Sequence, residues 1–244
     1  MDQKSAAFFE SQTILITGAS GYLASNLARQ LSKVDCRLFR LTRNIERLEK
    51  IEGVAQVQDV EGQLQDSELW NDVISSIQVV FHFAGQTSAY RAEEDPHQDF
   101  LSNVFPMILL LSACKKMGKQ PIVIYAGTSI QCGLNKEVLV NETLTDVPIT
   151  VYDFNKLEAE RYLKFAVQSG WIKGASLRLT NVYGPGPKSS SSDRGVLNLM
   201  MRKDLKGETL TVYGQGDFIR DYVYIDDVIS AFLKTALSDE GLQG

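Results

Sequence analysis

Short apolar runs alternate with stretches of helical periodicity along most of the chain. Residues 14–16, Ile-Leu-Ile, are an uninterrupted apolar run, which is typical of a strand buried on both faces of a parallel sheet. Further strands are predicted at residues 36–42, 54–58, 78–83, 122–125, 173–179, 210–213 and 222–227. Helices are predicted at residues 22–31, 66–76, 97–117 with an interruption at Pro106, 152–168, 196–206 and after residue 227. This alternation predicts an α/β fold with a doubly wound parallel sheet.

A glycine-bearing turn, residues 17–21, joins the first strand to the first helix. Strand, glycine turn and helix together place a dinucleotide pyrophosphate on a helix N-terminus. Gly18 permits a tight turn, Gly21 lets phosphates approach the backbone, and Ala24 stands where a third glycine is common. Many strand-to-helix turns bind nothing, but the position after a buried strand near the N-terminus favours cofactor binding.

The end of the second strand bears on the choice of cofactor. Folds that prefer NAD place an acidic residue there, whereas this chain has Thr42 and Arg43. A hydroxyl and a guanidinium suit a 2′-phosphate, so we predict NADP, with NAD as the alternative. The competing interpretation is a solvated basic face formed by Arg40, Arg43 and Arg47. Asp59, after the third strand, either accepts the adenine amino group or is a strand-end turn residue.

Tyr152 and Lys156 share one face of a predicted helix, one turn apart. A nearby ammonium stabilises a phenolate, so the tyrosine can exchange a proton with a sugar hydroxyl while hydride moves to a nicotinamide. Thr128, after the fifth strand, either hydrogen-bonds the reacting oxygen or belongs to a turn-forming Thr-Ser pair. His82 lies in an apolar strand, which is more typical of a hydrogen-bonded core histidine than of a catalytic one.

Composition narrows the partners and the compartment. The 244 residues carry a net charge of −5, which argues against nucleic acid as a main partner. No apolar run reaches membrane-spanning length, and the N-terminus lacks the apolar core of a signal peptide. Three cysteines without C-x-x-C spacing and two histidines predict free thiols, no metal site and a cytoplasmic protein.

Several motifs in fixed order carry a family resemblance. They are TGASGYLA (17–24), HFAG (82–85), AGTSIQCG (126–133), YDFNK (152–156), RLTNVYGPGP (178–187) and RDYVYIDDV (220–228). The chain resembles an extended short-chain dehydrogenase/reductase of the nucleotide-sugar epimerase/dehydratase family. The resemblance implies a Rossmann domain over residues 1–180 and a small, partly interleaved substrate lobe over residues 181–244. Members usually continue for several tens of residues, so part of this lobe is expected to be absent.

The resemblance also implies roles for individual residues. Tyr152 would transfer the proton, assisted by Lys156 and Thr128. Residues expected at the cofactor are Gly18, Ser20, Gly21, Tyr22, Leu23, Thr42, Arg43, Asp59, Val60, Phe83, Ala84, Gly85, Tyr152 and Lys156. Residues expected at a nucleotide-diphosphate sugar are Thr87, Asn181 and Arg220, although a salt bridge to Asp221 or Asp226 is the alternative for Arg220. Family members pair through the Tyr-Lys helix and the helix over 97–117, which predicts a homodimer; core burial explains these apolar faces equally well.

Departures from the family pattern narrow the chemistry. Dehydratases of this family carry a carboxylate just after the catalytic threonine, whereas this chain has Ser129 and Ile130. Members that both epimerise and reduce use a cysteine and a histidine where Ile130 and Gly186 stand here. Keto-sugar reduction and 4-epimerisation remain, and Thr42-Arg43 favours reduction by NADPH. The alternatives are a 4-epimerase with tightly bound NAD and a non-catalytic dinucleotide-sensing protein.

Overall fold

A six-stranded parallel sheet forms the centre of the computed structural model, which describes residues 1–134, 140–186, 196–212, 214–216 and 219–243. The strands are β1 (Thr13–Thr17), β2 (Arg37–Thr42), β3 (Gln56–Glu61), β4 (Val79–His82), β5 (Ile122–Thr128) and β6 (Lys173–Leu179). All neighbours are parallel, in the order β3-β2-β1-β4-β5-β6. This is the strand order of a doubly wound dinucleotide-binding fold, so the predicted fold class is confirmed.

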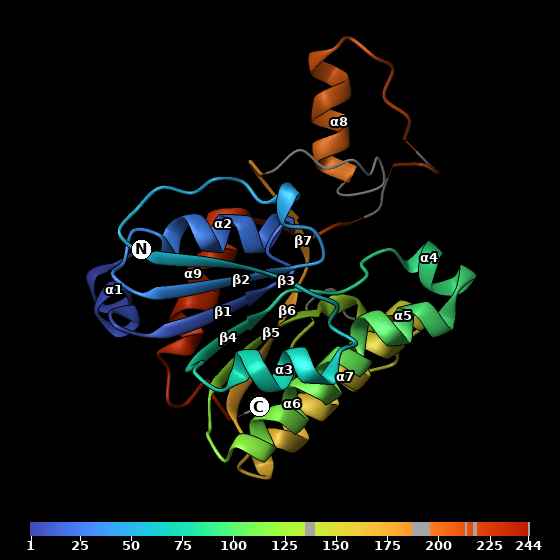
Figure 1. Cartoon of the computed structure of the whole chain (residues 1–244). Helices are drawn as coiled ribbons and strands as arrows, with labels where there is room; N and C mark the ends of the chain where they lie inside the picture. Colours follow the sequence, from blue (N-terminus) through green and yellow to red (C-terminus); the bar gives the residue numbers. More distant parts are fainter. Residues whose placement is uncertain (135–139, 187–195, 213, 217–218, 244) are drawn as a thin grey trace.

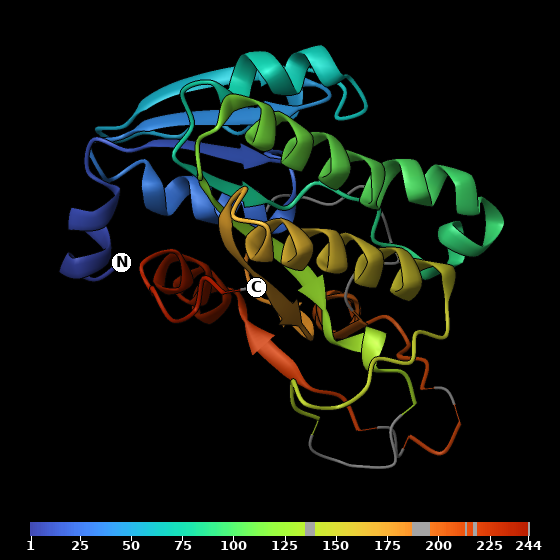
Figure 2. The same ribbon diagram turned by 90° about the horizontal axis from the view of Figure 1, so that it is seen from below.

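Helices cover both faces of the sheet, as Figures 1 and 2 show. One face carries α2 (Tyr22–Leu31) and α9 (Ile225–Ala236), which contact each other. The other face carries α3 (Ser67–Ile74), α6 (Phe105–Met117) and α7 (Val151–Gln168). The other helices in the described part of the chain are α1 (Gln3–Phe9), α4 (Ala89–Glu94), α5 (Pro96–Asn103), α8 (Val196–Leu205) and the short 3-10 helices η1 (Ile45–Arg47) and η2 (Ser129–Cys132).

The sheet separates two apolar cores. Ile14 and Ile16 of β1 point into the core under α2 and α9, and Leu15 points into the core under α3, α6 and α7. Phe81 and Phe232 are fully buried in the first core. The uninterrupted apolar run of β1 is explained by this arrangement, because a central parallel strand has no solvent-facing side.

Residues 96–117 pass a length and composition test for a membrane-spanning helix, with a mean hydropathy of 1.3. By this measure our prediction that no stretch reaches that length is wrong. The stretch is broken at Val104, between α5 and α6. Of the 18-residue apolar segment within it, 44% is buried inside the protein. Met107, Leu110 and Leu111 pack in the core shared with α3 and α7. The apolar residues of α6 therefore belong to the core of the α/β domain.

We predicted that Pro106 interrupts this stretch, but the break lies at Val104. Pro106 falls in the first turn of α6, where a missing N–H breaks no helical hydrogen bond. The third strand begins at Gln56, later than predicted, because the backbone N–H groups of Val54 and Ala55 both donate to the carbonyl of Ser32. β5 runs on to Thr128, so Thr128 ends a strand instead of following one.

Beyond β6 the chain leaves the sheet and later returns to it. β7 (Asn181–Tyr183) pairs in parallel with β8 (Tyr222–Tyr224), and Figure 1 shows α8 standing away from the sheet. The strand predicted at 210–213 is not formed over its described residues 210–212, and the predicted strand 222–227 gives way to α9 at Ile225. The predicted serine-rich loop at 189–192 lies outside the described residues. α9 lies beyond residue 181 in the sequence but contacts β5 and β6 of the main sheet. The domain boundary at residue 181 therefore stays a prediction.

Candidate active site

The glycine turn lies at the carboxyl edge of the sheet, between β1 and α2. Gly18 has a φ of +65°, and a Cβ on it would lie 2.8 Å from the Cα of Ala84. A Cβ on Gly21 would lie 2.9 Å from the carbonyl oxygen of Gly18, and no side chain caps the helix that begins there. The backbone thus forms a cradle next to a helix N-terminus, which suits a phosphate. These residues fit the pyrophosphate of a dinucleotide.

The end of β2 lies beside this turn. The hydroxyl oxygens of Ser20 and Thr42 are 3.3 Å apart, and the Arg43 side chain next to them is exposed. Arg40 points elsewhere: it is 6% exposed and donates to both carboxylate oxygens of Asp59, at 2.7 and 2.8 Å. Arg40 therefore does not belong to a solvated basic face. Arg43 directly follows Thr42 in the sequence, and its side chain is exposed.

The segment after β4 faces the same turn. The backbone N–H of Ala84 donates to the Thr17 hydroxyl at 3.1 Å, and the Phe83 ring packs 4.7 Å from that of Phe232. Gly85 is exposed, and a Cβ on it would lie 2.5 Å from Oδ1 of Asn103. The segment 83–85 therefore borders the cradle from the neighbouring strand. Val60, the neighbour of Asp59, is partly buried against the core under α3.

His82 is the hydrogen-bonded core histidine that its apolar strand predicts. It is fully buried, and its Nδ1 lies 2.9 Å from the Thr17 hydroxyl. The Thr17 hydroxyl also accepts from the backbone N–H of Ala84 at 3.1 Å, whereas Nε2 of His82 is buried and has no partner among the described residues. Burial, with the Lys156 charge nearby, lowers the pKa of His82 to about 3, and the ring is therefore neutral near pH 7.

Tyr152 and Lys156 lie one turn apart on α7, which packs against β5. The helix begins with a capping box in which Thr150 and Asp153 bond each other's backbone N–H. Tyr152 is 9% and Lys156 6% exposed, so both side chains are largely shielded from water. Thr128 is 7% exposed at the end of β5, and its side chain makes no capping bond to the following turn.

Lys156 is held in a defined position. Its Nζ donates to the carbonyl of Ala126 at 2.6 Å and lies 4.1 Å from the ring centroid of Tyr125. Burial lowers the pKa of Lys156 to about 7, while the charges of Asp99 and Glu160 act in the opposite direction. An ammonium in this place can stabilise a phenolate on the same helix face.

The predicted substrate residues Asn181, Arg220 and Thr87 come from two separate parts of the structure. Asn181 begins β7, and its Nδ2 donates to the carbonyl of Asp221 at 2.9 Å, which ties β7 to β8. Arg220 is exposed and donates to the carbonyl of Ile219 at 3.1 Å. Thr87 is exposed in the segment after β4. The structure thus places Asn181 and Arg220 together at the β7–β8 pair, with Thr87 on a separate segment.

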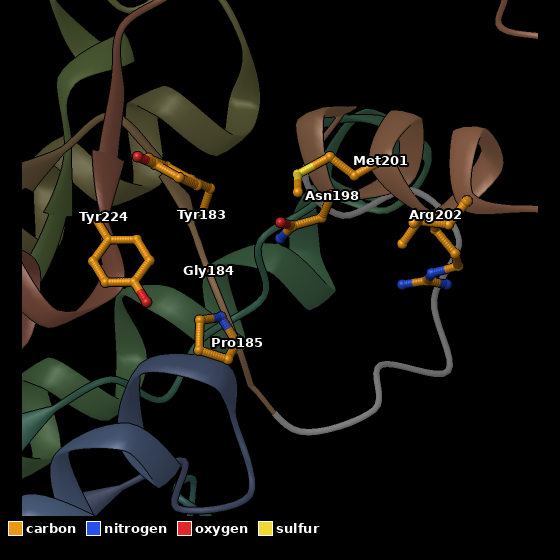
Figure 3. A pocket seen from close by; sticks show the side chains of 8 residues that line it. Tyr183, Gly184, Pro185, Asn198, Met201, Arg202 and Tyr224 are labelled. Atoms are coloured by element: carbon orange, nitrogen blue, oxygen red, sulfur yellow. The ribbon is translucent and has the colours of Figure 1, made fainter.

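A cavity of about 390 Å³ opens between the β7–β8 pair and α8 (Figure 3). Its lining is aromatic and apolar with an arginine and an asparagine: Tyr183, Gly184, Pro185, Asn198, Met201, Arg202, Leu205 and Tyr224. The phenol of Tyr22, on the glycine turn, donates to the carbonyl of Gly184 at 3.0 Å. The cavity therefore adjoins the cofactor cradle. The sequence analysis did not identify the α8 side of this cavity. Asn198, Met201 and Leu205 are spaced so that they share one face of a helix, and this spacing could have indicated it.

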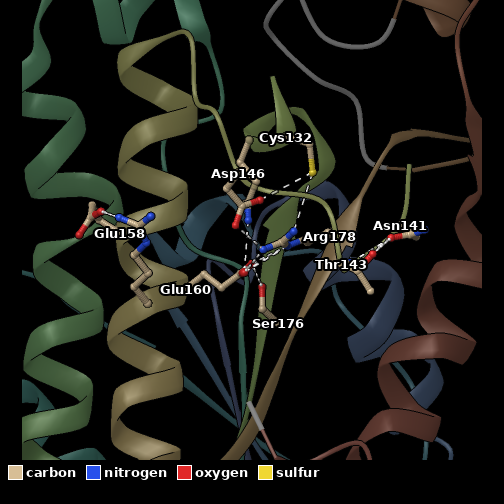
Figure 4. Close-up of polar contacts among 10 residues, drawn as sticks. Cys132, Asn141, Thr143, Asp146, Glu158, Glu160, Ser176 and Arg178 are labelled. Atoms are coloured by element: carbon tan, nitrogen blue, oxygen red, sulfur yellow. Dashed lines mark hydrogen bonds and ion pairs between the residues drawn. The ribbon is translucent and has the colours of Figure 1, made fainter. Parts of the chain in front are cut away.

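A charged cluster ties β6 to α7 and to Asp146, which lies shortly before α7 (Figure 4). Arg178 of β6 pairs with Glu160 of α7 at 2.6 Å and with Asp146 at 2.9 Å. Glu160 also accepts from the hydroxyl of Ser176 at 2.8 Å. Neither Arg178 nor Glu160 was singled out from the sequence. Their signal is spacing: Glu160 follows Lys156 by one helical turn, and residues 176 and 178 share a face of their strand.

Cys36, Cys114 and Cys132 are buried free thiols. Within the described ranges, no group of three or more His, Cys, Asp or Glu side chains is arranged to hold a metal ion.

A Rossmann-type sheet, a phosphate cradle at its carboxyl edge and a Tyr-Lys pair beside it define a dinucleotide-binding enzyme of the short-chain dehydrogenase/reductase type. The chain belongs to the NAD dependent epimerase/dehydratase family, which it matches over residues 14–244. The family resemblance in the motifs is thereby confirmed.

Known relatives agree with this assignment. A UDP-glucose 4-epimerase of Mycolicibacterium smegmatis is 27% identical over 225 residues, which cover 90% of this chain and 72% of that protein. The structure of UDP-glucose 4-epimerase from Thermotoga maritima with UDP-glucose superposes with a TM-score of 0.81 at 28% identity, over 91% of this chain and 72% of that one. UDP-glucose 4-epimerase of Thermus thermophilus in complex with NAD gives 0.79 at 28% identity, over 93% and 75%.

Proposed function

We propose that this protein is a nucleotide-sugar 4-epimerase that works with bound NAD, and that its substrate is a UDP-sugar. The observation that carries the proposal is the Tyr152–Lys156 pair beside the phosphate cradle, with Ser129 and Ile130 following Thr128. The pair supplies one proton carrier, and the strand end supplies no carboxylate to abstract a proton next to a carbonyl. Inverting a hydroxyl needs only one proton carrier and a hydride carrier, whereas dehydration needs a further base.

NAD, when bound, supplies a hydride acceptor and donor next to the sugar carbon. The residues that would hold it are those of the glycine turn, the segment 83–85, and Lys156 at the nicotinamide ribose. Tyr152 accepts the proton of the C4 hydroxyl as that carbon is oxidised, and returns it to the same oxygen when the ketone is reduced from the other face. Lys156 stabilises the phenolate, and the Thr128 hydroxyl donates a hydrogen bond to the reacting oxygen.

The preference for NAD over NADP rests on relatives. The Thermus thermophilus enzyme, 28% identical, is described in complex with NAD. An epimerase also regenerates its cofactor in every turnover and so gains nothing from a cofactor that dissociates.

The test is a product assay without added reductant. The protein is incubated with NAD and, separately, UDP-glucose, UDP-N-acetylglucosamine and UDP-glucuronate, and the C4 epimer is followed by the anomeric proton signal in NMR. Formation of a C4 epimer from any of them supports the proposal. Failure with all three, by a protein shown to bind NAD, contradicts it.

Reduction of a nucleotide keto-sugar by NADPH is the second candidate, favoured by one observation. The end of β2 presents the Thr42 hydroxyl and the exposed Arg43 instead of a carboxylate. Loss of NADPH absorbance at 340 nm on addition of a nucleotide 4-keto-sugar, with no epimerisation of UDP-sugars, would establish this candidate instead.

We also propose that the protein is a cytoplasmic homodimer. Phe154, Tyr162 and Phe165 on α7 are 51%, 42% and 55% exposed, and Phe100 on α5 is 39% exposed. An apolar surface of this kind suits a second copy of the chain. Light scattering that reports a monomer at micromolar concentration would contradict the dimer. Unpaired thiols suit a reducing compartment, which supports the cytoplasmic location.

A further inference from the structure

A buried carboxylate lies behind the Tyr-Lys pair. Asp99 of α5 is 1% exposed. Its Oδ1 accepts from Asn103 at 2.9 Å and from Gln86 at 3.0 Å, and its Oδ2 accepts from Asn155 at 2.7 Å. Three amide donors converging on two oxygens suit an ionised carboxylate, which accepts hydrogen bonds and donates none. The site is thus built to hold a negative charge.

The amides around Asp99 carry no charge to balance it. Taking an ion out of water is costly unless an opposite charge lies close. Asn155, whose side-chain amide donates to Asp99 at 2.7 Å, directly precedes Lys156 on α7. Among the described residues, Lys156 is the cation whose charge acts on Asp99. Burial raises the pKa of Asp99, and the hydrogen bonds from the three amides and, after them, the charge of Lys156 oppose that rise. Burial lowers the pKa of Lys156, and the charge of Asp99 opposes that fall.

The other groups around Lys156 do not replace Asp99. Glu160, one turn further on α7, also acts on Lys156 but is ion-paired with Arg178 at 2.6 Å. His82 on β4 is neutral, because its pKa is lowered to about 3 by burial and by Lys156. Tyr125 on β5 presents its ring face to Nζ. Tyr152 lies on the same helix face as Lys156. Asp99 is therefore the carboxylate near Lys156 that pairs with no arginine.

We propose that Asp99 is a positioning residue, a buried negative charge that raises the fraction of Lys156 that is protonated beside Tyr152. Asn155, Gln86 and Asn103 hold the carboxylate in place, and Asn155 couples it to the helix that carries both residues. The catalytic consequence rests on the proposed function, whereas the pairing of Asp99 with Lys156 does not.

The first experiment is the pH profile of turnover for Asp99→Asn. Without the carboxylate, Lys156 loses its proton at lower pH, so the alkaline limb of the profile should move down by about 1 to 3 units. Glu94→Gln removes an exposed carboxylate at the end of α4 and should leave both limbs in place. A profile for Asp99→Asn that is scaled down but not shifted would mean that Asp99 only supports the fold.

The second experiment needs no activity. Burial already raises the folded-state pKa of Asp99 above its unfolded value, and Lys156→Met, which removes the nearby positive charge, raises it further. The melting temperature of Lys156→Met should therefore fall, relative to wild type, as the pH rises from about 4 toward 8. The double variant Asp99→Asn/Lys156→Met should lose this pH dependence and melt above Lys156→Met at pH 8.

The two proposals fail in different ways. If wild type shows no turnover while the double variant rescues stability, the proposed function fails and the counter-ion stands. If the effects of Asp99→Asn and Lys156→Met on melting temperature simply add at every pH, the pairing is contradicted even in an active enzyme.

Discussion

At the scale of single residues, Tyr152 is the side chain on which the proposed proton transfer depends. Tyr152→Phe keeps the ring in its largely buried place and removes the proton carrier. Turnover should fall by at least about 100-fold, while affinity for the dinucleotide stays unchanged, because general acid–base catalysis contributes that much. Steady-state kinetics and a cofactor titration check this. Tyr162→Phe, 42% exposed on the same helix, is the control and should keep full activity. A dinucleotide sensor would keep its function in both variants.

His82 makes a prediction about acid sensitivity. Its folded-state pKa of about 3 lies below the unfolded value of 6.5, so the unfolded chain binds more protons between these values. The stability that this neutral histidine contributes is present above pH 6.5 and is lost as the pH falls toward 3. His82→Asn keeps a hydrogen-bonding group beside Thr17 but cannot take up a proton. Its unfolding free energy, measured in urea, should decline less between pH 6.5 and 4 than that of wild type; equal slopes would contradict a neutral buried imidazole.

At the scale of elements, the glycine turn offers a matched pair of substitutions. Gly18 and Gly118 have φ values of +65° and +63°, but only at Gly18 does a Cβ meet neighbouring atoms, the backbone of Ala84. Gly118→Ala should cost about 1 kcal/mol for the left-handed backbone alone and keep cofactor affinity. Gly18→Ala adds a clash with the segment after β4 and should also abolish dinucleotide binding. Calorimetric titration measures both, and equal affinities would refute the cradle.

The ion pairs of Arg178 link β6 to Glu160 of α7 and to Asp146 in the segment before α7. Arg178→Met leaves Glu160 and Asp146 without their shared cation. Because the arginine side chain is 21% exposed, the cost should be about 2 kcal/mol, less than for a fully buried pair. Arg161→Met removes a more exposed pair with Glu158 on the same helix and should cost about 0.5 kcal/mol or less. Denaturant unfolding compares the two, and equal costs would show that the cluster does not fix this region.

At the scale of the whole molecule, the central sheet was predictable and the supporting contacts were not. Apolar runs such as 14–16 mark central parallel strands, because a strand covered on both faces needs no polar side. The Tyr-Lys pair follows from helical spacing within one element. Asp99 and Arg178 escaped prediction because their partners come from distant segments, 56 residues away for Asn155 and 18 for Glu160. The strand expected at 210–213 failed because short apolar runs outside the sheet carry no signal for a pairing partner.

The proposed function requires that the cradle hold a dinucleotide, so the most direct measurement is to identify the dinucleotide that the protein carries. The purified protein is denatured, the released nucleotide is identified by chromatography, and the emptied protein is titrated with NAD and NADP. We predict NAD at close to one per chain, or tighter binding of NAD than of NADP by the emptied protein. Recovery of NADP would contradict the 4-epimerase proposal and favour the reductase, and binding of neither would contradict the assignment of the site.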